Sequence, residues 1–279
     1  GKYGGNIRRA LDFVLQQGER GRAFGNAHPP GFLHNAGHLG QQGPMYSHGF
    51  GTLFLGEVCG MVADRVLAER VHTGLTKAVQ VIVRAQNNEG GWRYNPIPFD
   101  ADISVTVCQM MALRSARNAG AFVPASVARR CIEYVKRCWT QGGGNGSYVY
   151  QASNPRFAFP GQGGGFARTA AGVAALYSAG IYQGPEIDSG LNFLLANRPQ
   201  RIGPQADMHY FYGHYYAVQA MWTAGGDYWS GWYPKVRDEL VRFQVNDGSW
   251  SDLLCTHYGT AMACIILQVP NNYLPILQK

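Results

Sequence analysis

The sequence predicts an all-α protein built from paired helices, and three observations lead to this fold class. Apolar residues recur at helical spacing in ten segments, whereas the alternation typical of strands is nearly absent. Segments with one apolar face alternate along the chain with segments that are apolar on nearly every side. In addition, a short motif ending in an aromatic residue recurs after the amphipathic segments.

The ten predicted helices form alternating outer and inner layers. Their ranges are roughly 5–17, 46–62, 66–86, 102–119, 124–139, 167–179, 185–197, 209–224, 230–244 and 256–268. Amphipathic segments such as PASVARRCIEYVKRC have one wet face, which predicts an outer position. The inner helices are expected at 46–62, 102–119, 167–179, 209–224 and 256–268, with Val105, Ala171 and Ala263 buried. The ten segments thus predict about five hairpins. Stacked hairpins of alternating outer and inner helices are typical of a helical solenoid, which becomes an α/α toroid if the hairpins close into a ring.

The recurring motif reads Q-x3-G-x-W. It occurs as Gln86 to Trp92 and as Gln244 to Trp250, and a degenerate copy runs from Gln141 through Gly146 to Tyr148. The glycine lets the chain turn sharply out of the preceding helix. We expect the aromatic ring to cover the seam between hairpins, and the Gln amide to satisfy backbone groups left open at the helix end.

Composition and charge exclude several classes of function. The net charge is +7, but the basic residues are scattered and form no run that would bind a phosphate backbone, so we predict no nucleic-acid partner. The six cysteines show no CxxC pair and predict reduced thiols. No apolar stretch approaches the roughly 18 residues of a transmembrane helix. The chain begins Gly1-Lys2 without Met, which indicates a trimmed N-terminus, and no cell compartment is predicted.

The Q-x3-G-x-W turns resemble the QW motifs of squalene and oxidosqualene cyclases and the related repeats of protein prenyltransferase β subunits. The closest resemblance is to bacterial single-domain proteins labelled prenyltransferase or squalene-cyclase repeat proteins, in the stretches DADISVTVCQMMALRSARNAG, YFYGHYYAVQAMW and YGTAMACIILQVPNNYLPI. The resemblance implies a single α/α-toroid domain over residues 1–279, with an aromatic-lined barrel that holds an isoprenoid or similar lipid. Family toroids have six hairpins. We therefore expect one N-terminal hairpin to be missing and a partner chain or oligomer to meet the open edge.

Parallel inner helices would bring polar residues at their N-terminal ends to one rim, a composition typical of small-molecule sites. These residues are Tyr46, His48, Asp100, Asp102, Ser104, Arg168, Tyr212, His214, Cys255 and His257. Aromatic rings on the segment from Tyr210 suit a carbocation or an isoprenoid chain, although such rings are also common in cores. The predicted substrate-binding residues are Tyr46, His48, Ser104, Arg168, Tyr212, Tyr216 and Trp222.

Asp100 and Asp102 are the candidate catalytic residues. The stretch Asp100-Ala-Asp102-Ile-Ser104 is similar to the D-x-D-D-T motif of class II terpene cyclases, with Ile103 in place of the third acid. The resemblance implies that Asp102 protonates an alkene, with Asp100 as its partner. The alternative is that Asp102 is a helix N-cap and Asp100 a solvated loop acid.

A zinc site is the other candidate centre. The stretches Tyr212-Gly-His214-Tyr and Asp252-Leu-Leu-Cys255-Thr-His257 are similar to the ligand-bearing helix starts of prenyltransferase β subunits. His214, Cys255 and His257 are therefore candidate Zn²⁺ ligands. The alternative is a buried cysteine with aromatic-packed histidines. Three functions stay open: an isoprenoid-binding cyclase-like or prenyltransferase-like protein, a non-catalytic toroid that binds a peptide, lipid or partner protein, and a zinc-dependent enzyme.

Overall fold

The computed structural model describes residues 2–20, 29–34, 43–140, 146–154, 165–199 and 209–278. All the regular elements in this part of the chain are helices, with no β-strand, which confirms the predicted all-α class. The α-helices are α1 (Gly4–Arg20), α2 (Pro44–Val58), α3 (Arg65–Ala85), α4 (Ile103–Asn118), α5 (Ala125–Thr140), α6 (Gly165–Ser178), α7 (Pro185–Ala196), α8 (Tyr210–Ala224), α9 (Gly226–Arg242) and α10 (Thr256–Gln268). Two short 3₁₀ helices follow, η2 (Val269–Asn271) and η3 (Pro275–Leu277).

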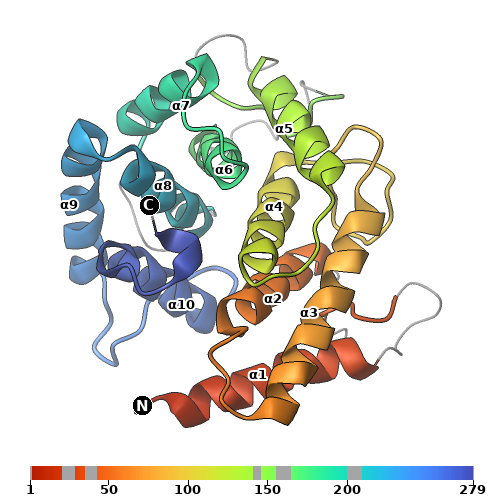
Figure 1. Ribbon diagram of the computed structural model, residues 1–279. Helices are drawn as coiled ribbons and strands as arrows, with labels where there is room; N and C mark the ends of the chain where they lie inside the picture. Colours follow the sequence, from red (N-terminus) through yellow and green to blue (C-terminus); the bar gives the residue numbers. More distant parts are fainter. Residues whose placement is uncertain are drawn as a thin grey trace. The chain divides into compact units, whose positions relative to one another are not determined.

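The helices belong to two compact units, Gly1–Tyr134 and Val135–Lys279, which we describe separately. In the first unit α2 packs against α3 and α4, and α1 packs against α3. In the second unit α6 packs against α7 and α8, and α8 also packs against α9 and α10 (Figure 1). A single toroid domain over 1–279, with one hairpin missing, stays a prediction.

The inner helices are buried to different degrees. Val105 in α4, Ala171 in α6 and Ala263 in α10 are each 0% exposed, which confirms their predicted burial. Helices α4 and α6 are buried along most of their length. Segments that are apolar on nearly every side are expected to be buried all round. This expectation is wrong for α10, because only one of its faces is buried and Cys264 is exposed.

The two complete Q-x3-G-x-W turns make the same pair of hydrogen bonds. In the Gln86 turn (residues 86–92), Gln86 Nε2 donates to the Gly90 carbonyl oxygen at 2.8 Å, and Trp92 Nε1 donates to that of Ile82 at 2.7 Å. In the Gln244 turn (residues 244–250), the corresponding bonds reach Gly248 at 2.9 Å and Leu240 at 2.8 Å. Each indole thus donates to a carbonyl in the last turn of the preceding helix, where few backbone donors are within reach.

The degenerate copy is described only in part, because Gln141 lies outside the described residues. We call residues 146–148 the Tyr148 turn. The Tyr148 amide donates to Thr169 Oγ1 at 3.3 Å, as the Trp92 amide donates to Thr106 Oγ1 at 3.1 Å. The aromatic residue of each turn is thereby attached to the inner helix that follows it.

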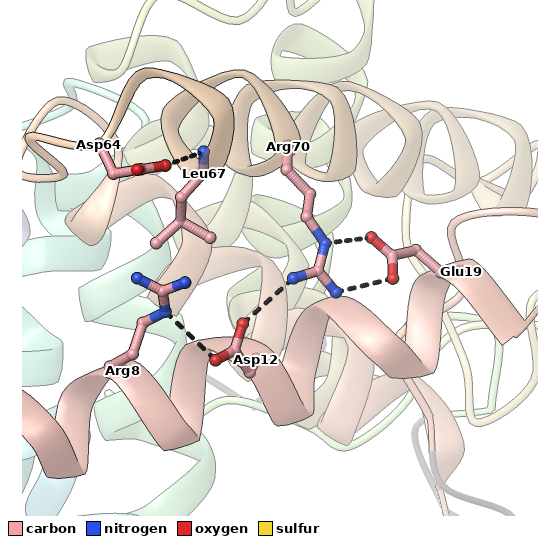
Figure 2. Close-up of polar contacts among 6 residues, drawn as sticks. All are labelled: Arg8, Asp12, Glu19, Asp64, Leu67 and Arg70. Carbon is pink, nitrogen blue, oxygen red and sulfur yellow. Dashed lines mark hydrogen bonds and ion pairs between the residues drawn. The ribbon is translucent and has the colours of Figure 1, made fainter.

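Helix α1 is joined to α3 by an ion-pair network. Figure 2 shows Arg70 of α3 between Asp12 and Glu19 of α1, with Arg8 beside Asp12. Arg70 lies 3.1 Å from Asp12 and 2.6 Å from Glu19, and Arg8 lies 3.2 Å from Asp12. The hydrogen bond from Arg70 lowers the pKa of Glu19. Because these side chains are partly exposed, the network orients α1 and adds little stability.

Candidate functional site

Arg93 joins the two predicted catalytic acids of the first unit. Asp102 is 0% exposed and is the N-cap of α4, with Oδ1 accepting from the Val105 amide at 2.8 Å. Arg93 Nε lies 3.7 Å from Asp102 Oδ2, and Arg93 Nη1 lies 3.5 Å from Asp100 Oδ2. Both the cap and the guanidinium stabilise an ionised carboxylate, whereas a proton donor must hold its proton. These contacts are those of a structural cap.

The start of α2 lies beside this cluster. The Met45 amide donates to the Tyr94 carbonyl oxygen at 2.9 Å, and the rings of Tyr46 and Tyr94 are 6.2 Å apart. The Arg93 guanidinium lies over the Tyr94 ring, 4.6 Å from its centre. Ser104 is half-buried in the first turn of α4, and its carbonyl accepts from the Cys108 thiol at 3.5 Å. Of the predicted residues, Tyr46, Asp100, Asp102 and Ser104 therefore belong to this end of the first unit.

His48 has a structural role in the same unit. Its Nδ1 accepts from the Leu33 amide at 3.0 Å, and its Nε2 donates to the Ala78 carbonyl oxygen at 3.1 Å. Burial lowers the pKa of His48 to about 3, so the ring is neutral. Because both ring nitrogens are bonded within the protein, His48 has no ring atom left for a substrate, and its predicted substrate-binding role is not supported.

The aromatic residues of α8 divide between its two ends. Tyr212 is half-buried and Tyr216 is fully buried, with their rings 4.9 Å apart and edge to face. Trp222 packs against Trp229 of α9 at 4.9 Å, near the C-terminal end of α8. Ten residues of helix place Trp222 about 15 Å along the axis from Tyr212. Tyr212 and Tyr216 therefore form one aromatic wall, and Trp222 belongs elsewhere.

His214 is enclosed by aromatic rings. Its Nδ1 donates to the Tyr210 carbonyl oxygen at 2.9 Å, and its ring lies 4.1 Å from that of Tyr210, 5.1 Å from that of Phe166 and 5.7 Å from that of Trp232. Burial lowers the pKa of His214 to about 3. The second nitrogen, Nε2, is buried, and none of the described residues forms a hydrogen bond with it. These surroundings are those of an aromatic-packed histidine, which was the alternative to a zinc ligand.

The other two predicted zinc ligands lie on the surface. Cys255 is exposed and is the N-cap of α10, where its sulfur accepts from the Tyr258 amide at 3.4 Å. His257 is exposed in the first turn of α10. Among the residues that the structure describes, no three His, Cys, Asp or Glu side chains are grouped to hold a metal ion. The zinc hypothesis gains no support from this arrangement.

Two arginines, Arg168 and Arg93, hold loops in place beside the predicted site residues. Arg168 Nε donates to the Tyr148 carbonyl oxygen at 3.2 Å, so the guanidinium holds the Tyr148 turn. Sequence reasoning missed Arg93, although it directly follows Trp92. The Asp102 amide donates to the Trp92 carbonyl oxygen at 3.0 Å, which brings Arg93 beside Asp102. This hydrogen bond between two loop residues leaves no periodic pattern in the sequence from which it could be predicted.

Comparison of the sequence with protein-family models and with curated proteins finds no match. No described helix combines the length and the apolar character needed to cross a membrane, in agreement with the sequence.

Proposed function

We propose that this chain is a cyclase-like or prenyltransferase-like α/α-toroid protein that binds an isoprenoid or similar lipid, with Tyr212 and Tyr216 as part of the binding surface. The observation that carries the proposal is the shared bonding of the two Q-x3-G-x-W turns. Gln86 and Gln244 each satisfy the carbonyl of their own glycine, and Trp92 and Trp250 each satisfy the preceding helix. The spacing that resembles QW motifs thus has the same physical use in both places.

The aromatic wall suits the proposed ligand. Tyr216 is buried and Tyr212 is half-buried, and their rings lie 4.9 Å apart, so one member of the pair is within reach of solvent. Ring faces pack against unsaturated carbon chains and attract cationic intermediates. The contacts of Asp102 support ligand binding without proton transfer from this residue, because its carboxylate caps α4 beside Arg93.

A binding titration tests the proposal. Farnesol and squalene, added in mild detergent, would be followed by calorimetry with the wild type, Tyr212→Ala and the control Tyr273→Ala, whose side chain is 73% exposed outside α8. We expect Tyr212→Ala to weaken binding about fivefold or more, as loss of one ring contact worth roughly 1 kcal/mol would do. The control should bind as the wild type does. Absence of binding by the wild type, or equal binding by all three proteins, would overturn the proposal.

A further inference from the structure

Two of the three aromatic turns are covered by the outer helix that follows them. A Cβ atom built on Gly90 would collide with the carbonyl oxygen of Arg130 in α5. A Cβ atom built on Gly146 would likewise collide with that of Ser189 in α7. In both turns glycine is needed because a helix backbone occupies the space where a side chain would lie.

Hydrogen bonds fix these two docked helices at corresponding positions. Gln86 Nε2 donates to the Val127 carbonyl oxygen at 2.9 Å, and the Tyr148 hydroxyl donates to that of Glu186 at 3.0 Å. Each acceptor lies three residues before the carbonyl that faces the glycine. In the Gln86 turn, Arg130 also donates to Gln86 Oε1.

The Gln244 turn has the same internal bonds but no such cover. Among the described residues, the only atom within 4 Å of a Cβ built on Gly248 belongs to Gln244, at 3.8 Å. Gln244 is exposed, whereas Gln86 is 6% exposed. Val245 is 46% exposed, whereas Asn87, at the same place in the Gln86 turn, is 2% exposed. In the part of the chain that the structure describes, nothing therefore covers the helix-docking surface of this turn, and the apolar Val245 lies in it.

Helix α1 has the complementary property. It is amphipathic, and residues 4–10, its N-terminal half, are exposed. Ile7 is 51% exposed on this half, and Tyr3, directly before the helix, is 61% exposed, so apolar side chains lie uncovered here. The same half carries Arg9 and Arg8, the latter also paired with Asp12, and Lys2 precedes it, while the Gln244 turn carries the exposed Asp247.

We infer that the Gln244 turn of one copy of this chain receives the N-terminal half of α1 from a second copy. The docked helix would use Ile7 against Val245, and a basic residue of α1 would donate to Gln244 as Arg130 donates to Gln86. Such a contact joins two different surfaces, so copies associate head to tail. The positive charge of α1 and the carboxylate of Asp247 favour this pairing over turn-to-turn contact.

Two complementary variants test the inference by sedimentation velocity over a range of protein concentrations. Ile7→Asp damages only the α1 surface and Val245→Asp damages only the turn. Because both side chains are exposed, neither change should unfold the chain, and circular dichroism checks this. The controls are Phe13→Asp, on another face of α1, and Phe122→Asp, which are 53% and 84% exposed in the native chain. Arg9→Glu is a second α1 variant.

The head-to-tail arrangement predicts a distinctive result. The wild type and both controls should associate as concentration rises, while each interface variant alone stays monomeric. An equimolar mixture of Ile7→Asp and Val245→Asp should form a one-to-one dimer, because one intact α1 surface meets one intact turn. A wild type that is monomeric at every concentration, interface variants that associate as the wild type does, or a mixture that stays monomeric would overturn the inference.

Discussion

The side-chain amide of Gln86 donates a hydrogen bond to the carbonyl oxygen of Val127 at 2.9 Å, which ties a turn after α3 to the first residues of α5. The same amide also donates to the Gly90 carbonyl oxygen at 2.8 Å. One buried residue therefore closes its own turn and positions the next outer helix. Gln244 closes its own turn in the same way but is exposed and has no equivalent bond to a following helix in the described residues.

Replacing these two glutamines by alanine should therefore have unequal effects. Gln86→Ala leaves two buried carbonyls without this donor, and we expect the free energy of unfolding to fall by about 2–3 kcal/mol. Gln244→Ala removes one exposed bond and should cost roughly 0.5 kcal/mol or less. Chemical denaturation of both variants measures the difference, and equal costs would contradict the assigned role of Gln86.

Asp102 should behave as a helix cap with an added charge interaction. Asp102→Ala is expected to lower the free energy of unfolding by about 1–2 kcal/mol through loss of the bond to the Val105 amide. Asp102→Asn keeps an acceptor for that amide but removes the charge beside Arg93, so it should still be destabilising.

The matched control for this prediction is Asp64, the exposed N-cap of α3, which accepts from the Leu67 amide at 2.7 Å. Asp64→Asn should cost less than Asp102→Asn, as measured by denaturation of both. In the binding titration, Asp102→Asn should still take up the isoprenoid. Similar stability of the two Asn variants would show that the interaction with Arg93 contributes nothing.

Acid should destabilise the folded chain through its two buried histidines. The pKa values of His48 and His214 are about 3 in the folded state, whereas an unfolded histidine titrates near 6.5. Between these values the unfolded state binds the additional proton. The free energy of unfolding should thus be independent of these groups above pH 6.5 and fall as the pH is lowered toward 3.

The slope can be assigned with a pair of variants. Each buried histidine should contribute a slope of about 1 kcal/mol per pH unit within that window. His48→Gln should reduce the slope, whereas the control His72→Gln, at an exposed position of α3, should leave it unchanged. Denaturation curves between pH 4 and 7 measure it. A slope that is unchanged in His48→Gln would contradict the neutral, buried state of this ring.

The helices could be predicted from sequence because their periodicity records which faces are buried. The segment predicted at 256–268 is α10 itself, and the segment predicted at 102–119 differs from α4 by one residue at each end. The predicted use of Gln86 is wrong in its partner, because its amide donates to the Gly90 and Val127 carbonyls and not to the end of α3. The Trp92 indole is the group that donates to a carbonyl of that helix end. The one-sided burial of α10 could not be predicted, because a uniformly apolar helix does not reveal which of its faces other helices will cover.

The candidate site was predicted less well because it depends on loops. Asp102 was recognised at the start of α4, but the bridge from Trp92 that brings Arg93 to it has no sequence signal. His48 and His214 look alike in sequence. His48 has both ring nitrogens bonded within the protein, whereas His214 has a buried nitrogen that no residue in the described ranges bonds. Which backbone groups meet a ring is decided by packing between helices.

Photo-crosslinking tests the proposed function most directly. A farnesol analogue carrying a diazirine would be irradiated with the native chain, with and without excess farnesol, and the labelled peptide identified by mass spectrometry. We predict labelling in α8, Tyr210–Ala224, at or beside Tyr212, that excess farnesol abolishes and Tyr212→Ala reduces. Labelling that avoids α8, or that excess farnesol leaves unchanged, would contradict the proposed isoprenoid site.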